Sequence, residues 1–282
     1  MNSIEKAVAG LFKTKVVPES SPPTQPVAGT DRHRPIQQNR KFRIDFDDLA
    51  RLGYVMPGDA ASKTAEELRL IKRPILRNAF GKDMVATESA NLVMVSSSVP
   101  AEGKTFTALN LAMSIVMERD TTVLLVDGDV VNPSLSRLFG LQREPGLTDL
   151  LTNPDMNVAD VILDSDIPHL RFLPAGKPHA YSTELVASER MHELARELSK
   201  RYPDRIVMFD SPPLLAATQA SVLSHHVGQI IVVVEAGKTP ESMLREAVEL
   251  LDQTKTIGLV LNKSRRYVGR DHYGAYYGSA EK

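Results

Sequence analysis

One stretch limits the possible folds of this chain more than any other: the segment at residues 98–105, SVPAEGKT, which joins a short apolar run to a helical pattern. The run at residues 92–95 is partly β-branched and is followed by three serines, which is typical of a buried strand. Residues 103–118 contain no proline and are apolar on most faces, which predicts a helix buried against a sheet. The segment therefore predicts a strand, a tight loop and a helix.

The loop fits the phosphate-binding pattern G-x-x-x-x-G-K-[ST], except that Ser98 replaces the first glycine. In such a loop, backbone N–H groups and the positive end of the helix surround a phosphate chain. Lys104 adds charge at the outer phosphates, and the Thr105 hydroxyl can bind Mg²⁺. A chance Gly-Lys-Thr is the alternative, and the predicted strand and helix argue against it. The expected nucleotide-binding residues here are Ser98, Pro100, Ala101, Glu102, Gly103, Lys104, Thr105 and Phe106.

Carboxylates follow two further predicted strands. Residues 122–126 are followed by Asp127 and Asp129, and residues 205–209 by Asp210. The carboxyl ends of strands are where an open α/β sheet binds its ligand, and Asp210 fits a Walker B pattern, whose carboxylate holds Mg²⁺ through water. The alternative for Asp127 and Asp129 is a surface turn of the Asp-Gly type. We expect Lys104, Asp127, Asp129 and Asp210 to be catalytic, with Thr105, Asp129 and Asp210 at the metal.

The alternation of strands and helices continues along the chain. Further strands are predicted at residues 170–174, 229–234 and 256–261, and helices at residues 184–201 and 240–253. This order predicts an α/β fold with a doubly wound, parallel sheet and crossover helices over residues 91–262.

Composition sets limits on the partners and the compartment. The 282 residues carry 34 Lys and Arg against 35 Asp and Glu, a formal net charge of -1, which gives no case for nucleic acid as a partner. The absence of cysteine excludes disulfides, thiolate metal sites and a cysteine nucleophile. No apolar run approaches the roughly 18 to 20 residues of a membrane span. With no apolar signal-peptide core at the N-terminus, we expect a cytoplasmic protein that reaches a membrane only through a partner.

The chain divides into three parts. We expect residues 1–60 to hold a short amphipathic helix and a disordered linker, residues 61–262 to form the P-loop domain, and residues 263–282 to form a flexible tail. The helix at residues 1–16 docks on a partner, on the protein itself or on a membrane surface. A basic cluster in the linker region is interpreted as a solvated tether: Arg32, Arg34, Arg40, Lys41 and Arg43.

Two side-chain groups outside the P-loop are candidates for function. Four of the seven tyrosines lie in the tail, which has no apolar periodicity, and exposed hydroxyls tethered to a nucleotide site are natural phosphoryl acceptors. A helical pattern at residues 64–75 places Glu66, Arg69 and Lys72 on one face, either as surface ion pairs or as a subunit contact. The candidate acceptors are Tyr267, Tyr273, Tyr276 and Tyr277.

The segments VMVSSSVPAEGKT, VLLVDGD and IVMFDSPP, followed by the tyrosine cluster, resemble the bacterial tyrosine kinases over about residues 62–282. The N-terminal arrangement and EELRLIKRP look most like the autokinases of exopolysaccharide loci, including those associated with exosortase. The resemblance implies a P-loop NTPase fold of the partitioning-ATPase-like type, with ATP and Mg²⁺ as cofactors. It also implies autophosphorylation of the tail tyrosines in trans, which regulates exopolysaccharide polymerisation and export.

The resemblance also implies roles for single residues. Asp127 is the candidate base for the tyrosine hydroxyl, Asp129 and Asp210 organise Mg²⁺, and Asn262 contacts adenine. A helix with Glu66, Arg69 and Lys72 mediates assembly of a ring-like homo-oligomer. A membrane-bound activator of the chain-length-determinant type recruits the cytoplasmic protein to the inner face of the membrane.

Two residues depart from the family pattern. Val131 stands where an arginine is common, and Lys72 replaces an arginine whose planar, bidentate pairing a lysine cannot reproduce. The competing functions are a partitioning or septum-positioning switch ATPase, and a scaffold in which ATP binding only orders a polysaccharide machine. The switch ATPases carry a lysine five residues before the P-loop lysine, where this chain has Val99.

Overall fold

The computed structural model describes residues 40–56, 62–81, 89–202 and 204–264. The described residues all lie within the compact unit Asn39–Lys282. The expected helix at residues 1–16, most of the linker and the four candidate acceptor tyrosines lie outside the described residues. Within the described part of the chain, no helix is both long and apolar enough to cross a membrane.

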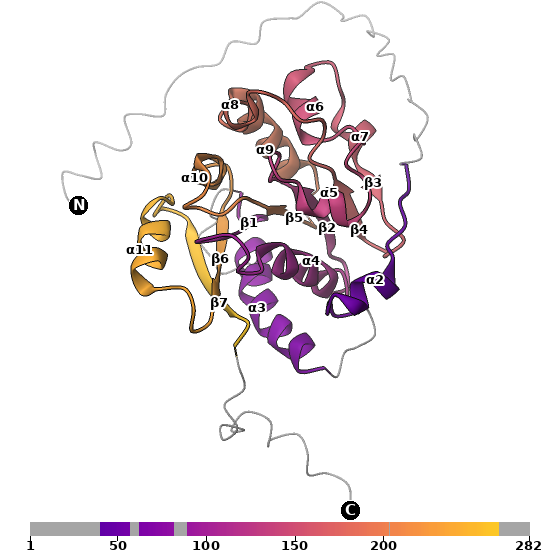
Figure 1. The fold of residues 1–282 in the computed structure, drawn as a ribbon. Coiled ribbons are helices and arrows are strands. Elements are labelled where there is room, and N and C mark those ends of the chain that lie inside the picture. Colours follow the sequence, from indigo (N-terminus) through magenta and orange to yellow (C-terminus); the bar gives the residue numbers. More distant parts are fainter. Residues whose placement is uncertain (1–39, 57–61, 82–88, 203, 265–282) are drawn as a thin grey trace, which may run out of the picture. The chain divides into compact units, whose positions relative to one another are not determined.

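The described strands form one seven-stranded sheet with the order β3-β4-β2-β5-β1-β6-β7 (Figure 1). All neighbouring pairs are parallel except β3 and β4, which only the short connection at residues 165–169 separates, so β4 returns antiparallel to β3. The sheet is therefore mostly parallel, as predicted. The strands are β1 (Leu92–Ser97), β2 (Thr122–Asp127), β3 (Leu163–Asp164), β4 (Leu170–Leu173), β5 (Arg205–Asp210), β6 (Gln229–Glu235) and β7 (Thr256–Asn262).

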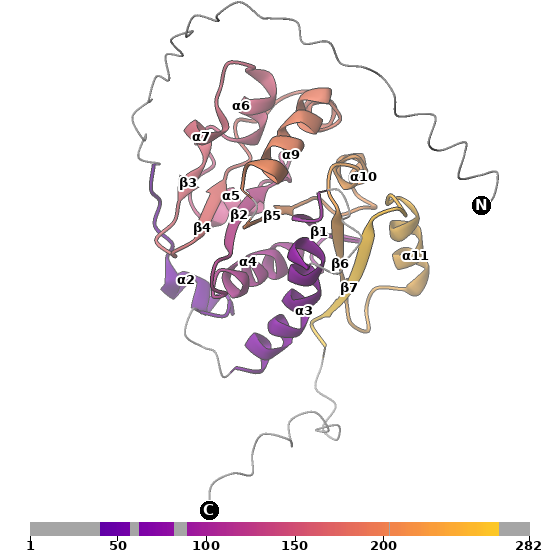
Figure 2. The same cartoon turned by 180° about the vertical axis from the view of Figure 1, so that it is seen from behind.

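Helices connect the strands and cover both faces of the sheet (Figures 1 and 2). The helix predicted at residues 184–201 is two helices in the structure, because the Ser188 side chain accepts a hydrogen bond from Met191 N and begins a new helix there. The helices are α2 (Phe46–Arg51), α3 (Lys63–Phe80), α4 (Lys104–Ile115), α5 (Ser134–Leu138), α6 (Leu147–Thr152), α7 (Val158–Val161), α8 (Ser182–Val186), α9 (Glu189–Arg201), α10 (Thr218–Ser224) and α11 (Glu241–Glu249).

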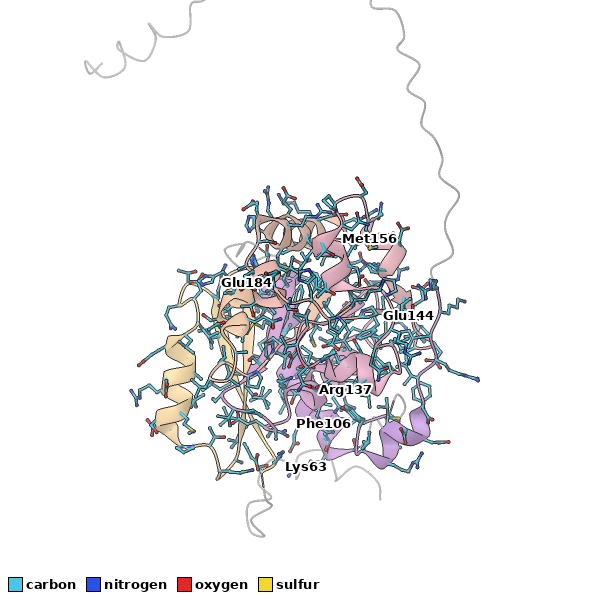
Figure 3. All side chains as sticks on the ribbon, turned by 45° about the horizontal axis from the view of Figure 1, so that its top comes forward. Lys63, Phe106, Arg137, Glu144, Met156 and Glu184 are labelled. Atoms are coloured by element: carbon cyan, nitrogen blue, oxygen red, sulfur yellow. The ribbon has the colours of Figure 1, made fainter. Side chains whose placement is uncertain are left out.

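The core consists of two hydrophobic clusters, one on each face of the sheet. Alternate residues of β1 divide between them: Leu92 and Met94 pack in the cluster that includes residues of α9 and α10, and Val93 and Val95 in the cluster that includes residues of α3 and α4. Side chains fill both spaces between sheet and helices (Figure 3). Because the central strands are buried on both faces, they are apolar at nearly every position.

The compact domain begins before residue 61, the boundary predicted from the sequence. Ile44 and the α2 residue Leu49 are buried in the same cluster as the residues of α4, and Phe42 packs against it. The expected boundary at residue 61 leaves these side chains outside the domain, whereas the structure has them in its core. The local pattern is short and charged, so only the tertiary contact reveals that it belongs to the fold.

Candidate functional site

The phosphate-binding loop connects β1 to α4, as predicted. Gly103 is the N-cap of α4 with φ of 102°, and a Cβ at this position would lie 2.1 Å from Asn262 Nδ2. Only glycine combines this left-handed conformation with so close an approach. Ala101 also has a positive φ, 68°. The sequence pattern therefore identifies a loop whose backbone is set by tertiary contact as well as by the turn.

The charged side chains of the predicted site meet at the carboxyl ends of β1, β2 and β5. Lys104 Nζ lies 3.5 Å from Asp129 Oδ2 and 3.7 Å from Asp210 Oδ1. The Thr105 hydroxyl donates to Asp210 Oδ2 at 2.7 Å. Residues from three separate segments of the chain are thus brought into one site, and the positive end of α4 faces them.

Asp127 lies deeper than Asp129. The register of β2 and β5 pairs Asp127 with Asp210, and both are fully buried. Asp127 Oδ2 accepts a hydrogen bond from Ser136 N at 2.7 Å, whereas Asp129 turns toward Lys104, so the two aspartates do not share one environment. The extended geometry of β2 ends at Asp127, so a spacing of two residues does not bring both carboxylates to the same side.

Burial controls the ionisation of the two paired carboxyls. It raises the pKa of Asp127 to about 7, with a further contribution from the charge of Asp210. It also raises the pKa of Asp210 to about 6, while Lys104 and the Thr105 hydroxyl oppose that rise. Each group therefore changes protonation near neutral pH, which is the range that suits proton transfer.

The oxygen atoms at this site fit Mg²⁺. Among the described residues, Asp127 Oδ1 and Asp210 Oδ1 are buried without a hydrogen-bond partner, and the Thr105 hydroxyl lies beside Asp210. The described chain holds no cluster of three or more acidic or histidine side chains arranged for a metal. Carboxylate and hydroxyl oxygens suit Mg²⁺, which proteins usually bind through one or two carboxylates together with substrate phosphates and water. Thr105, Asp129 and Asp210 would hold it.

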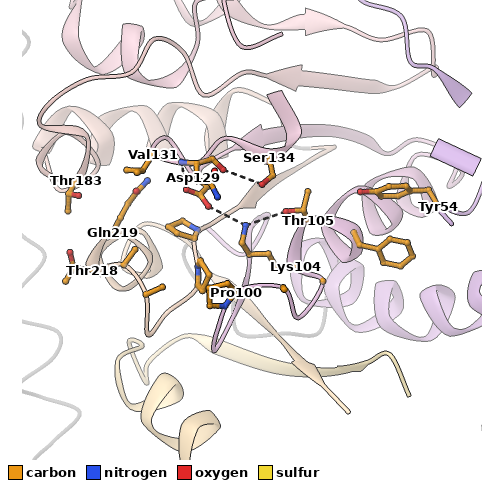
Figure 4. Close-up of a pocket in the computed structure, with 18 residues that line it drawn as sticks. Tyr54, Pro100, Lys104, Thr105, Asp129, Val131, Ser134, Thr183, Thr218 and Gln219 are labelled. Carbon is orange, nitrogen blue, oxygen red and sulfur yellow. Dashed lines mark hydrogen bonds and ion pairs between the residues drawn. The ribbon is translucent and has the colours of Figure 1, made fainter. Parts of the chain in front are cut away.

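A pocket of about 830 Å³ opens beside the charged groups. Figure 4 shows Lys104 reaching toward Asp129, with Pro100 on one side and Gln219 and Thr218 at the far end. Asp127 does not line the pocket, because the end of β2 lies behind the pocket wall and its side chain is fully buried there. The pocket is the space in which a phosphate-bearing substrate and an acceptor can meet.

Tyr54 lines this pocket, although no sequence pattern predicts it there. Its hydroxyl points toward Thr105 (Figure 4), and its ring packs 4.9 Å from that of Phe106. Val55 N donates to Asn110 Oδ1 at 2.8 Å, which anchors the segment on α4. Burial raises the pKa of Tyr54 to about 12, and the charge of Asp210 adds to this, so the phenol keeps its proton. No sequence signal links a tyrosine after a short helix to the P-loop.

Glu102 and Asn262 shape the loop from behind. Glu102 is 1 % exposed, and its carboxylate accepts hydrogen bonds from Val99 N at 2.8 Å, from Glu235 N at 3.2 Å and from the Thr239 hydroxyl. Asn262 Nδ2 donates to the Glu102 carbonyl at 2.8 Å. Both side chains therefore hold the loop against the ends of β6 and β7, and their expected contacts with a nucleotide stay predictions.

Of the other residues predicted to bind the nucleotide from the loop, all but Ser98 line the pocket. Pro100, Ala101, Gly103 and Phe106 line the pocket, as do Lys104 and Thr105. Ser98 does not, and its hydroxyl is buried without a hydrogen-bond partner within the described part of the chain.

The three residues predicted for self-assembly do not share one environment. Glu66 and Arg69 form an ion pair on the surface of α3. Lys72 is buried, donates to the Ser114 carbonyl of α4 at 2.8 Å and pairs with Glu118 at 2.7 Å. Lys72 thus joins α3 to α4 within one chain, because it lies on the side of α3 that faces α4.

The fold and the site together define a P-loop nucleotide-binding protein with an open, mostly parallel sheet. A family model described as an AAA domain matches residues 92–264. Tyrosine-protein kinase YwqD of Bacillus subtilis (strain 168) is 32% identical over 248 residues, which cover 87% of this chain and 97% of YwqD. The solved chimerical protein CapA2B2 has a TM-score of 0.64 and 26% identity, covering 80% of this chain and 95% of that chain.

The chain belongs to the bacterial tyrosine kinase family. Other members are longer: tyrosine-protein kinase ptk of Acinetobacter johnsonii is 32% identical over 208 residues, which cover 73% of this chain but only 28% of ptk. The family resemblance inferred from the motifs is thereby confirmed.

Proposed function

We propose that this protein is an ATP-dependent protein-tyrosine autokinase that phosphorylates its own C-terminal tyrosines. The observation that carries the proposal is the convergence of Lys104, Thr105, Asp129 and Asp210 beside one pocket, behind which lies the buried Asp127. These are the groups that phosphoryl transfer requires: a positive charge for the phosphates, oxygen ligands for a metal and a carboxylate for the acceptor proton.

Each residue has a distinct task in the proposed reaction. The loop backbone and Lys104 Nζ hold the phosphate chain of ATP and stabilise negative charge on the transferring group. Thr105, Asp129 and Asp210 are the ligands for Mg²⁺, which when bound neutralises phosphate charge. Asp127 Oδ1, the free oxygen of its carboxylate, takes the proton of the tyrosine hydroxyl as the new O–P bond forms and the bond to ADP breaks. The Asp127 pKa of about 7 places this transfer near neutral pH.

The acceptors in this proposal are Tyr267, Tyr273, Tyr276 and Tyr277 of a neighbouring subunit. Transfer in trans requires self-association, for which we propose a ring-like homo-oligomer with Glu66 and Arg69 at the contact. We also propose a role in exopolysaccharide polymerisation and export, on the resemblance of the motifs to the autokinases of exopolysaccharide loci. We further propose cytoplasmic localisation and recruitment to the inner face of the membrane by an activator of the chain-length-determinant type.

Intact mass after incubation with ATP and Mg²⁺ tests the proposal. The expected result is a ladder of phosphate additions that disappears in Lys104→Met and in a variant with phenylalanine at the four tail tyrosines. Co-expression with a membrane activator shows whether the ladder depends on it. Release of phosphate from ATP without any change in protein mass, even with the activator, would instead support the switch ATPase.

A further inference from the structure

Another cavity lies at the amino ends of the strands, opposite the carboxyl ends that carry the P-loop site. It has a volume of about 450 Å³ and lies at the amino ends of β2, β4 and β5. Because Asp210 and Arg205 are the two ends of β5, the cavity and the P-loop site are separated by about 17 Å along the strand. Its lining includes Lys41, His169, Arg171 and Arg205.

Arg205 is buried without a carboxylate partner. It is 3 % exposed, and among the described residues no acidic side chain lies within ion-pair distance of it. Its guanidinium lies 3.7 Å from the centre of the Tyr202 ring, and Nε makes a long hydrogen bond of 3.5 Å to the Thr122 hydroxyl. Of its guanidinium nitrogens, Nε alone has a hydrogen bond to another described residue, so further N–H donors of the group can serve a ligand in the cavity.

Strand register brings a second guanidinium to the same face. Arg205 aligns with Thr122, and Arg171 aligns with Leu124 two residues further along β2, so both side chains leave the sheet on one side. Arg171 pairs with Asp164 at 2.9 Å. Burial lowers the pKa of Arg205 and the charge of Arg171 lowers it further, while Tyr202 and the charge of Asp204 oppose that fall.

The structure assigns an oxyanion-binding site to this cavity, with a phosphate monoester as its ligand. Two guanidinium groups can each donate paired hydrogen bonds to a tetrahedral oxyanion, a geometry that suits phosphate. Lys41, whose backbone forms a parallel β-bridge with Asp164, adds a further positive charge to the lining. The acidic lining residues Asp164 and Asp204 leave the cationic lining residues in excess. A bound anion would offset the repulsion between the two guanidinium groups.

Two sources supply such a ligand. One is a small free phosphate ester. The other is a phosphotyrosine of the C-terminal segment, an assignment that rests on the proposed function because it requires the chain to make phosphotyrosine. In that case the cavity would bind the phosphotyrosine that the reaction makes, at a distance from the P-loop.

Titration calorimetry on the full chain tests the site, with phenyl phosphate as the probe and ADP and Mg²⁺ at saturation to fill the P-loop. Charged hydrogen bonds contribute enough that Arg205→Gln should weaken binding by about tenfold or more. Arg171→Gln changes a half-exposed side chain, so it serves as a second variant if Arg205→Gln does not fold. Arg190→Gln, on the surface of α9 away from the cavity, is the matched control and should bind as the wild type does.

A peptide of residues 263–282 with phosphotyrosine at positions 267, 273, 276 and 277 distinguishes the sources. Tighter binding of this peptide than of phenyl phosphate, lost in Arg205→Gln, supports the tail as ligand. Equal binding of both supports a small free phosphate ester. Unchanged binding in both Arg205→Gln and Arg171→Gln, or no binding of either probe, would overturn the site.

These outcomes are independent of the proposed kinase activity. If phenyl phosphate binds through Arg205 but the protein mass never changes with ATP, the oxyanion site stands and the autokinase proposal fails. If the phosphate ladder forms but the arginine variants bind as the wild type does, the reverse holds.

Discussion

At the scale of single residues, the site depends on carboxyl groups whose surroundings differ. Asp129 faces the pocket and Lys104, whereas Asp127 is enclosed and held by Ser136 N. Two aspartates that are two positions apart in the chain can therefore have separate tasks, one at the phosphates and one at the proton. Both side chains are buried, so the difference comes from their partners, Ser136 N for Asp127 and Lys104 for Asp129.

The stability of the metal-free protein should fall as pH rises from about 5 to 8. The folded chain keeps a proton on Asp127 up to about pH 7, whereas the pKa of an aspartate in the unfolded chain is about 3.9. Between these values the folded state binds more protons, so the free energy of unfolding decreases as pH rises. Urea denaturation in EDTA measures it, and we expect a loss on the order of 3 kcal/mol.

The variant Asp127→Asn tests the assignment of this pH dependence to Asp127. Its amide has the same shape but does not titrate, so the slope between pH 5 and 8 should be smaller. A slope equal to that of the wild type would mean that another group causes the pH dependence.

In phosphoryl transfer, the same variant should lose most of its turnover while still binding ADP.

Glu102→Gln should weaken nucleotide binding through the shape of the loop. The carboxylate accepts three hydrogen bonds, and an amide turns one of these acceptors into a donor that faces another donor. A cost on the order of 1 to 3 kcal/mol is expected, shared between stability and ADP affinity. Calorimetric titration with ADP measures it, and Glu249→Gln on exposed α11 is the control.

At the scale of elements, the segment from Phe42 to Val55 is part of the domain although it precedes the P-loop fold proper. Leu49 of α2 fills the core beside α4, and Tyr54 follows it into the pocket. Tyr54 N donates to the Leu49 carbonyl at 3.0 Å, so the packing of α2 and the position of the phenol are linked. A short element thereby connects the core to the site.

Leu49→Ala should therefore affect both stability and the site. Removing this buried side chain is expected to cost about 2 to 5 kcal/mol, measured by urea denaturation, and to loosen Tyr54. The exposed Leu52→Ala is the matched control, because Leu52 follows α2 outside the core. If Leu49→Ala were as stable as the wild type, α2 would not be part of the cooperative unit.

The contact between α3 and α4 depends on Lys72. Lys72→Met leaves the Ser114 carbonyl and Glu118 without their cation and should lower the free energy of unfolding by about 1 to 3 kcal/mol. Chemical denaturation compares it with Lys63→Met on the exposed start of α3. A loss of self-association with unchanged stability would place Lys72 in a subunit contact instead.

At the scale of the whole molecule, the P-loop pocket and the proposed oxyanion site lie at opposite ends of the strands of one sheet. The P-loop pocket lies at the carboxyl ends of the strands, where open α/β sheets bind their ligands. The cationic cavity lies at the amino ends. The proposed self-association and tail phosphorylation also belong to this scale. Each proposed phosphate would add roughly -1.5 to -2 charges to a tail that carries lysine and arginine.

Phosphorylation should weaken self-association. Repulsion among several phosphates opposes assembly, so sedimentation velocity should show smaller species after incubation with ATP and Mg²⁺ than after incubation with ADP. The double variant Glu66→Lys, Arg69→Glu keeps its ion pair within the helix but reverses the charges that a partner meets, and should also assemble less. A fully phosphorylated protein that assembles as strongly as the unmodified one would contradict the idea.

The sequence alone determined the features that depend on local pattern. Apolar runs, turn residues and the order of elements predict the strands and the P-loop, because fully buried strands must be apolar and a phosphate loop needs its glycine and lysine. Asp129 and Asp210 were also predictable, since an acidic residue at the end of a strand has few other places to lie than the ligand edge.

Tertiary structure decided the features that depend on contacts between distant segments. Tyr54 reaches the pocket only because α2 packs on α4, and the Glu102 carboxylate lies where it can accept hydrogen bonds from the Glu235 amide and the Thr239 hydroxyl. Lys41, interpreted from composition as part of a tether, lines a cavity with Arg171 and Arg205 because the strand register brings them together. Local pattern carries no record of such neighbours, since burial and distance arise only when the whole sheet has formed.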